Sequence, residues 1–199
     1  MSDREELEAV IEEWLGPGDV PGPERMTRWF TKDEAFDAHL RARFGTLIDR
    51  AIEGELDAEA RDPRGALGLV LVLDQLTRNV HRGTPRAFAG DARALEVADA
   101  ALARGDDARL PEQHRAFLYM PLMHAEDVAA QEDCVRRFEH LARTCSPAAR
   151  EGLESAADYA RRHRDIVARF GRFPHRNAIL GRESSAEERA FLTQPGSSF

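Results

Sequence analysis

An abrupt polar run follows the most apolar stretch of the chain, in the sequence LDQLTRNVHR at residues 73–82. In a helix, which turns by roughly 100° per residue, Asp74, Arg78 and His81 fall within a narrow arc that continues the apolar face before them. The three side chains would then point into the protein, where charges must be paired, and Asp74 and Arg78 are spaced to pair as i and i+4. Three interpretations stay open: an internal ion-pair network that ties helices together, a ligand pocket, and a solvated helix end.

Histidines supply a second candidate chemistry, because imidazole gains and loses protons near neutral pH. His163 lies near the centre of the apolar face of a long helix predicted to reach residue 170. Such a histidine is either a hydrogen-bonded core residue or a site residue that transfers protons. We take His163 and His124 as the two candidate proton carriers, and Asp74 as the carboxylate that orients the ligand contacts.

A group of cations follows that long helix. Arg172, His175 and Arg176 crowd a segment that Gly171 and Pro174 interrupt. Loops that hold fixed cations among Gly and Pro turns often bind anions. The alternative is that the arginines form a solvated or packing surface.

The spacing of possible metal ligands does not favour a metal site. No two of the candidate ligands have the H-E-x-x-H or E-x-x-H spacing that places both on one helical face. The sequence also lacks a phosphate-binding glycine loop, a nucleophile elbow and a cluster of paired cysteines. We therefore predict no metal, and the sequence names no cofactor. The residues considered as ligands are His81, His124, His163 and His175, with Glu126, Asp127 or Asp165.

Composition excludes several classes of partner. The 199 residues are 42% hydrophobic and 32% charged, without an apolar run near the ~20 residues that a membrane-spanning helix requires. A net charge of -8 argues against a general nucleic-acid binder, which needs excess cations to neutralise phosphates. The acidic, amphipathic start is unlike a signal peptide, so we expect a cytoplasmic protein. Cys134 and Cys145 lie about 16 Å apart at helical rise, so we expect reduced thiols.

Apolar positions recur at the helical period, which predicts a single all-α domain over residues 1–199. Short connections favour stacked antiparallel helical hairpins, although no repeat is visible at a 34-residue period. The apolar run 66–73 should lie centrally as a helix, with a buried strand as the alternative. We expect about eight helices. The first four run from the Ser2 cap to Gly16, from the Thr31 cap to Gly54, from Asp62-Pro63 through the polar run, and over Asp91–Arg104. The last four begin at Pro111, with a kink or end at Pro121, run over Asp127–Thr144, run from Ser146-Pro147 to Phe170, and begin at Ser184 or Ser185.

A resemblance to a known family rests on the sequence of five segments, at residues 73–79, 82–91, 117–127, 163–182 and 196–199. Taken in order, they resemble an uncharacterised bacterial family known as domain of unknown function 924. The resemblance implies an all-helical fold similar to tetratricopeptide-repeat proteins, and it implies no activity. The chain departs from the family pattern where Leu76-Thr77 replaces Phe-Pro, which should soften a bend near Asp74, and where Ala125 replaces a Ser that would cap the next helix. The segments are LDQLTRN (73–79), RGTPRAFAGD (82–91), FLYMPLMHAED (117–127), HRDIVARFGRFPHRNAILGR (163–182) and GSSF (196–199).

The leading prediction is a polar pocket among the third, fifth and seventh helices that accepts an anionic small molecule, in a binding or enzymatic domain. A rival is a scaffold that lays a peptide of a protein partner in the groove of stacked hairpins. A third interpretation is that the polar residues only hold the helices in register. The predicted ligand contacts are Arg78, His81, Arg172, His175 and Arg176.

Overall fold

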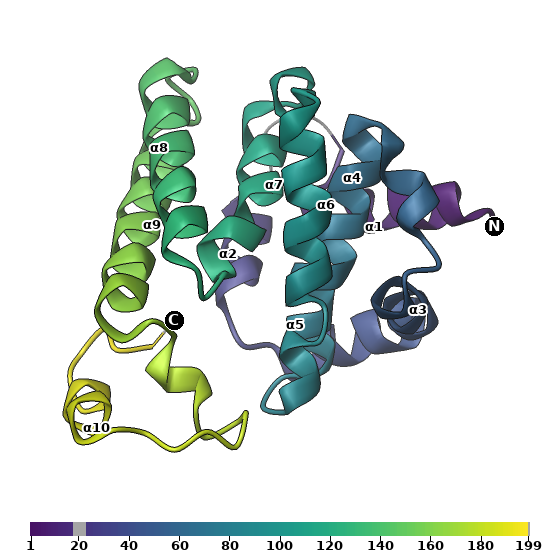
Figure 1. The fold of residues 1–199 in the computed structure, drawn as a ribbon. Helices are drawn as coiled ribbons and strands as arrows, with labels where there is room; N and C mark the ends of the chain where they lie inside the picture. Colours follow the sequence, from purple (N-terminus) through teal and green to yellow (C-terminus); the bar gives the residue numbers. More distant parts are fainter. Residues whose placement is uncertain (18–22, 199) are drawn as a thin grey trace.

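The computed structural model describes residues 1–17 and 23–198, and every regular element in these ranges is a helix (Figure 1). The all-α prediction is therefore confirmed for the described chain. Most of the Pro/Gly-rich loop expected after Gly16 lies outside these residues, as does Phe199. The α-helices are α1 (Asp3–Leu15), α2 (Pro23–Phe30), α3 (Glu34–Glu53), α4 (Pro63–Val70), α5 (Thr77–Val80), α6 (Asp91–Ala103), α7 (Glu112–His124), α8 (Val128–Thr144), α9 (Arg150–Phe170) and α10 (Ala186–Leu192).

Several helix ends lie where side-chain caps predict them. Ser2 and Glu5 form the capping box of α1, and Ser185 and Glu188 form that of α10. Asp62 caps α4 by accepting hydrogen bonds from two backbone N–H groups of the first turn. Short polar caps are local in sequence, so these boundaries could be predicted before any tertiary contact was known.

Other boundaries differ from the prediction. Asp33, and not Thr31, caps α3, because its Oδ1 accepts from the backbone N–H groups of two following residues at 3.0 Å each. Helix α7 continues through Pro121 and ends at His124. The short helix α2 was not predicted at all.

The start of α9 also differs from the prediction. The helix begins at Arg150, and residues 147–149 form a turn. The side chain of Ser146 was expected to cap it but donates instead to Oε2 of Glu112 at 2.7 Å, and its backbone N–H donates to Oε1 of the same carboxylate. A contact with α7 thus takes the place of the local cap.

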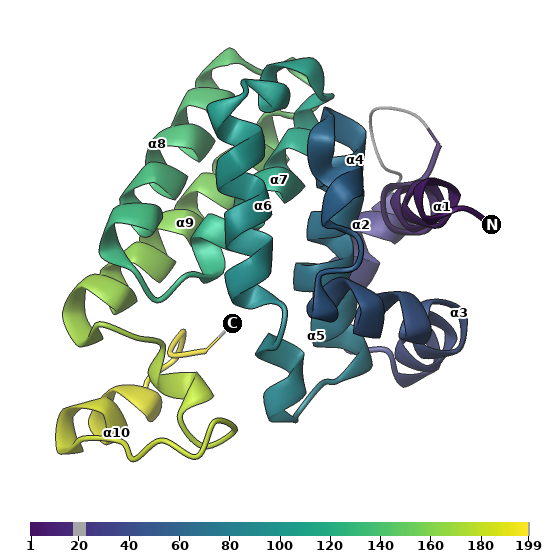
Figure 2. The same cartoon turned by 45° about the vertical axis from the view of Figure 1, so that its right-hand side comes forward.

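A buried rod runs through the centre of the fold. Helix α4, a π-helical segment (Leu71–Leu76) and α5 follow one another without a break, and the apolar side chains of residues 66–73 are fully buried. Helices α1 and α3 pack on one side of the rod, and α6 and α7 pack on the other (Figure 2). The helical interpretation of the apolar run is correct. The π-helical segment occupies the position near Asp74 where a softened bend was expected.

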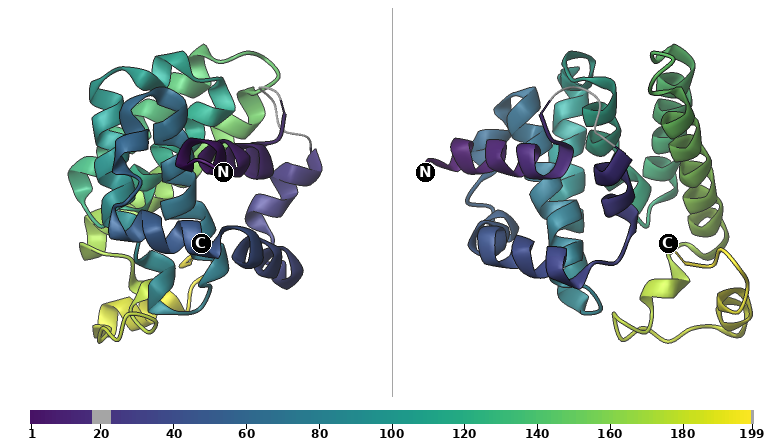
Figure 3. Two further views of the ribbon diagram at one scale, coloured as in Figure 1. Left: turned by 90° about the vertical axis from the view of Figure 1, so that its right-hand side faces the viewer. Right: turned by 180° about the vertical axis from the view of Figure 1, so that it is seen from behind.

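The long helices α8 and α9 form an antiparallel pair that lies against α7. Figure 3 shows this pair, in green, as a pillar along one side of the molecule. Beyond Gly171 the chain turns away from α9 through a 3-10 helix (Pro174–Arg176) and reaches α10. We call residues 171–198 the C-terminal segment. In the described part of the chain, no helix combines the length and apolar character needed to cross a membrane.

The C-terminal segment packs on a small apolar cluster of its own. Phe173 is fully buried there with Ile166 and Val167 of α9, and Phe170 and Phe191 pack around them. This cluster is separate from the main core. The apolar cluster therefore attaches the C-terminal segment to α9, and polar contacts attach it to Glu126 and Asp91.

Candidate functional site

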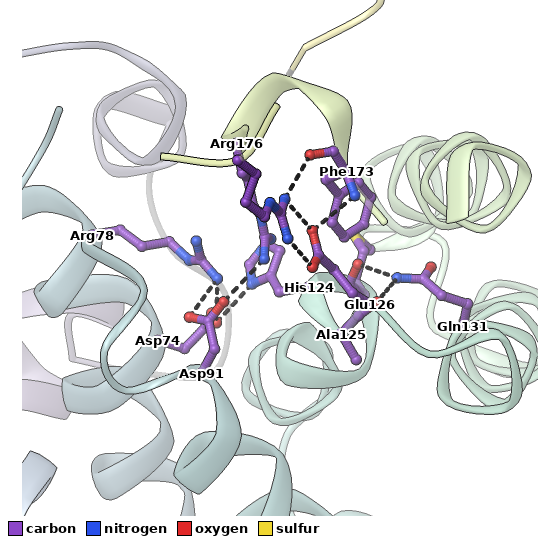
Figure 4. Close-up of polar contacts among 11 residues, drawn as sticks. Asp74, Arg78, Asp91, His124, Ala125, Glu126, Gln131, Phe173 and Arg176 are labelled. Atoms are coloured by element: carbon purple, nitrogen blue, oxygen red, sulfur yellow. Dashed lines mark hydrogen bonds and ion pairs between the residues drawn. The ribbon is translucent and has the colours of Figure 1, made fainter. Parts of the chain in front are cut away.

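Asp74 is the centre of a polar cluster, and its side chain is fully buried (Figure 4). Its Oδ1 accepts from Nδ1 of His124 at 2.7 Å and from Nη2 of Arg78 at 3.3 Å. Its Oδ2 accepts from Nε2 of Gln75 at 2.6 Å. Burial alone would raise the pKa of the carboxyl, but His124, Arg78 and Gln75 outweigh it and hold that pKa well below its usual range. Asp74 is therefore a fixed negative charge inside the protein.

A second carboxylate, Asp91, begins α6 beside the rod. Its Oδ1 accepts from Nη2 of Arg78 at 2.8 Å, and its Oδ2 accepts from Nη1 of Arg176 at 3.2 Å. Gly90 allows this approach, because a Cβ atom at that position would lie 2.2 Å from the carbonyl oxygen of Leu73. The close contact between α6 and the rod thus brings the two carboxylates to one guanidinium.

His124 is the last residue of α7, and its side chain is 16% exposed. Because the ionised Asp74 can only accept, the ring nitrogen that faces it, Nδ1, carries the proton, and Nε2 is left with a lone pair. Burial lowers the pKa of His124 and the attraction of Asp74 opposes that shift, with a net lowering. At neutral pH the imidazole is therefore neutral, with Nε2 able to accept a proton.

The turn after His124 connects the cluster to the C-terminal segment. Oε1 of Glu126 accepts from the backbone N–H of Phe173 at 2.8 Å. Both carboxylate oxygens of Glu126 also bind Arg182, at 2.6 and 2.9 Å. This attachment holds the chain that carries Arg176 against the end of α7 (Figure 4).

The two arginines of the cluster keep unused donors. Arg176 is 6% exposed, and its guanidinium lies over the rings of Phe88 and Phe173, at 4.9 and 4.5 Å from their centroids. Arg78 lies 5.3 Å from the same Phe88 ring. Within the described structure, Nε of each arginine is buried without a hydrogen-bond partner. Burial, with the charge of Arg78, lowers the pKa of Arg176 to about 10. Carboxylates in the cluster thus leave the positive charge of Arg176 incompletely compensated.

Two further histidines line the cluster. The ring of His163, on α9, lies 6.2 Å from that of His124 and 5.5 Å from that of Phe173. Burial, and then the proximity of His124, lowers the pKa of His163 to about 3. Burial and the charge of Arg176 lower the pKa of His175 to about 4. Both rings are therefore neutral at neutral pH.

Two sequence-predicted ligand contacts lie apart from this arrangement. His81 follows the end of α5, where the backbone is no longer helical, and its Nε2 accepts from Nε of Arg86 at 3.3 Å. The wider π-helical turn and the helix end explain why the 3.6-residue period did not extend to His81. Arg172 is engaged by both oxygens of Glu188, at 2.7 and 2.9 Å. The structure brings together Asp74, Arg78, His124, His163, His175 and Arg176.

Sequence reasoning did not single out several residues of the cluster as site residues. Asp91 and Phe88 lie in the segment RGTPRAFAGD, and Arg182 ends the segment that begins at residue 163. Glu126 lies in the segment FLYMPLMHAED and was considered as a metal ligand but not as a contact of this cluster. The family-like segments were thus the available signal for all four residues. Gln131, whose side chain donates to the carbonyl oxygens of Met123 and Ala125, lies outside those segments, and no sequence pattern indicated these bonds.

No set of three or more His, Cys, Asp or Glu side chains among residues 1–17 and 23–198 is arranged to hold a metal ion. Of the four histidines considered as ligands, His81 contacts Arg86, His163 and His175 contact the ring of Phe173, and His124 bonds to Asp74. What the cluster offers is a neutral imidazole beside a buried carboxylate and two arginines.

The fold and the cluster define an all-helical protein with a buried carboxylate–imidazole–guanidinium centre. Residues 10–196 match the family described as "Bacterial protein of unknown function (DUF924)", and the chain belongs to this family. A similar solved structure is described as "Structure of Protein of Unknown Function ATU0120 from Agrobacterium tumefaciens". The two chains are 39% identical with a TM-score of 0.79, over 94% of this chain and 96% of that one. No curated protein matches the chain.

Proposed function

We propose that the cluster around Asp74 binds a small anionic molecule and transfers a proton to or from it at Nε2 of His124. The observation that carries this proposal is the fully buried carboxylate of Asp74, which accepts from Nδ1 of His124 at 2.7 Å. A buried carboxylate in this position fixes the tautomer and the orientation of the ring, as it does in general-base catalysis. His124 would be the catalytic residue, and Asp74 would orient it.

Arg78 and Arg176 would hold the anionic group. Each uses one terminal nitrogen on the carboxylates of the cluster, and each has a buried Nε without a partner among the described residues. A guanidinium binds carboxylate or phosphate best through two parallel donors, which Arg176 can still present through Nε and Nη2, whereas Arg78 keeps Nε and Nη1. The lowered pKa of Arg176 indicates that an added negative charge would be favourable there.

The distribution of exposed apolar side chains favours a small ligand over a peptide. Among the side chains that the structure describes, the large apolar ones that are well exposed are Met1, Val128 and Tyr159, which belong to different parts of the chain. A peptide-binding groove needs a row of anchors instead. We further infer a single cytoplasmic domain with reduced cysteines, which the free, buried Cys134 and Cys145 support. We also infer a hairpin arrangement like that of tetratricopeptide repeats, which the α8–α9 pair supports.

Thermal unfolding with and without inorganic phosphate, at matched ionic strength, tests the anion site. Phosphate at a hundred times its dissociation constant should add about 2.7 kcal/mol to the stability of the parent protein. Arg176→Gln and Arg78→Gln should abolish this gain, because each removes one of the two cations. Arg161→Gln is the matched control, since Arg161 of α9 pairs with Glu139 of α8 and with Asp158, neither of which belongs to the cluster.

The structural interpretation predicts the opposite result. If the arginines serve only as an ion-pair network, the parent protein gains nothing from phosphate. Removing either cation would then take an ion-pair partner from buried Asp74 or half-buried Asp91, and the unliganded protein should lose up to roughly 3 to 5 kcal/mol. That combination would refute the anion site.

A further inference from the structure

The last turn of α7 carries His124, and backbone groups there need partners from outside the helix. Carbonyl groups at a helix C-terminus have no intrahelical N–H to accept from. Two carbonyl oxygens that flank His124 are bound by one side chain of α8: Nε2 of Gln131 donates to the oxygen of Met123 at 2.6 Å and to that of Ala125 at 2.8 Å. One amide group thus bonds to the backbone on both sides of the histidine (Figure 4).

Gln131 is fully buried, and both protons of its amide are used in these two bonds. The start of α8 does not require Gln131, because Asp127 caps that helix by accepting from the backbone N–H of Ala130 at 2.8 Å. The two bonds of Gln131 therefore serve the turn of His124 and not the helix that carries Gln131.

The orientation of a side chain depends on how firmly its backbone is held. The bond from Nδ1 of His124 to Asp74 is 2.7 Å long, so a displacement of the turn by a few tenths of an ångström would weaken it. Residues that lock such turns decide how well a catalytic group is pre-organised. We infer that Gln131 is a positioning residue, which holds the backbone on both sides of His124 so that Nδ1 stays on Asp74 and Nε2 keeps one direction. This inference rests on the proposed function of His124.

Gln131→Met tests the inference, because methionine has a similar size but cannot donate. The matched control is Gln113→Met, the same change at a second buried glutamine, in the first turn of α7. The readout is the ¹⁵N–¹H resonance of Nδ1–H of His124 in the full-length protein, assigned by its loss in His124→Gln. In Gln131→Met the exchange of this proton with water should rise by at least about tenfold. In Gln113→Met the exchange should match that of the parent protein.

Two outcomes would overturn the inference: an unchanged exchange rate in Gln131→Met, or an equal rise in both variants, which would reflect a general loss of stability. Should Gln131→Met fail to fold, Gln131→Asn replaces it with the same expected direction, because the asparagine amide is one methylene shorter and cannot reach both carbonyl oxygens. Phosphate should still raise the melting temperature of Gln131→Met, because Arg78 and Arg176 are untouched. Absence of that effect in the parent protein would instead count against the proposed anion site.

Discussion

Asp74 carries its charge where no part of its side chain is exposed, so the groups that bind it decide both its own state and the state of His124. The pairing with Arg78 could be predicted from the i, i+4 spacing. The pairing with His124 could not, because 50 residues separate the two in sequence. It arises from the contact of α7 with the π-helical segment, which no local pattern encodes.

The neutral histidines give the protein a defined dependence on pH. The pKa of His163 is lowered to about 3 and that of His175 to about 4, against about 6.5 in an unfolded chain. Below pH 6.5 the unfolded chain therefore takes up protons that the folded protein does not. The free energy of unfolding should fall as the pH decreases from about 6.5 to about 4, by up to about 1.4 kcal/mol per pH unit for each such histidine.

Urea unfolding at several pH values in this window measures that slope. His163→Phe should make it shallower, because phenylalanine fills the site beside Phe173 and takes up no proton. Replacing the exposed His140 by Gln should leave the slope as in the parent protein. An identical slope in the parent and in His163→Phe would contradict the role given to His163.

At the scale of elements, local signals predicted the helix ends that local side chains determine, and they failed where a distant group intervenes. The capping boxes of α1 and α10 are made within four residues. The start of α9 was misplaced because Glu112, which lies 34 residues before Ser146, engages the expected cap. The π-helical segment was not predicted either, and it shifts the face of every residue after it.

The contact of α6 with the rod can be tested by adding one methyl group. Gly90→Ala would place a Cβ atom 2.2 Å from the carbonyl oxygen of Leu73, so α6 must move away, at a cost of about 1 to 3 kcal/mol. Gly45→Ala is the matched control, because its Cβ atom would meet its nearest neighbour at 4.0 Å inside α3. That change should stabilise the protein by roughly 0.5 to 1 kcal/mol.

Equilibrium unfolding in urea distinguishes the two glycines. Gly90→Ala should also weaken the stabilisation by phosphate. The carboxylate of Asp91 moves with α6, and this carboxylate binds the two arginines that would hold the anion. If both substitutions change stability by the same amount and in the same direction, the close approach at Gly90 is not what positions Asp91.

At the scale of the whole molecule, the site depends on segments that are far apart in the chain. Arg176 reaches Asp91 across 85 residues, because the C-terminal segment returns to the bundle and is held there by Glu126 and by the small apolar cluster around Phe173. Sequence analysis predicted the all-α class and grouped Arg78 with Arg176. The contact of both arginines with the ring of Phe88 and the bond of Arg172 to Glu188 could not be predicted, because they depend on how the segment folds back.

The most direct test of the anion site is a crystal of the protein soaked in tungstate, a tetrahedral dianion whose anomalous scattering locates it without ambiguity. We expect one strong anomalous peak within hydrogen-bond distance of the guanidinium groups of Arg78 and Arg176, on the side of His124. The same soak of Arg176→Gln should lack that peak. Tungstate bound only at exposed surface arginines, with Arg78 and Arg176 still paired only to Asp74 and Asp91, would contradict the account.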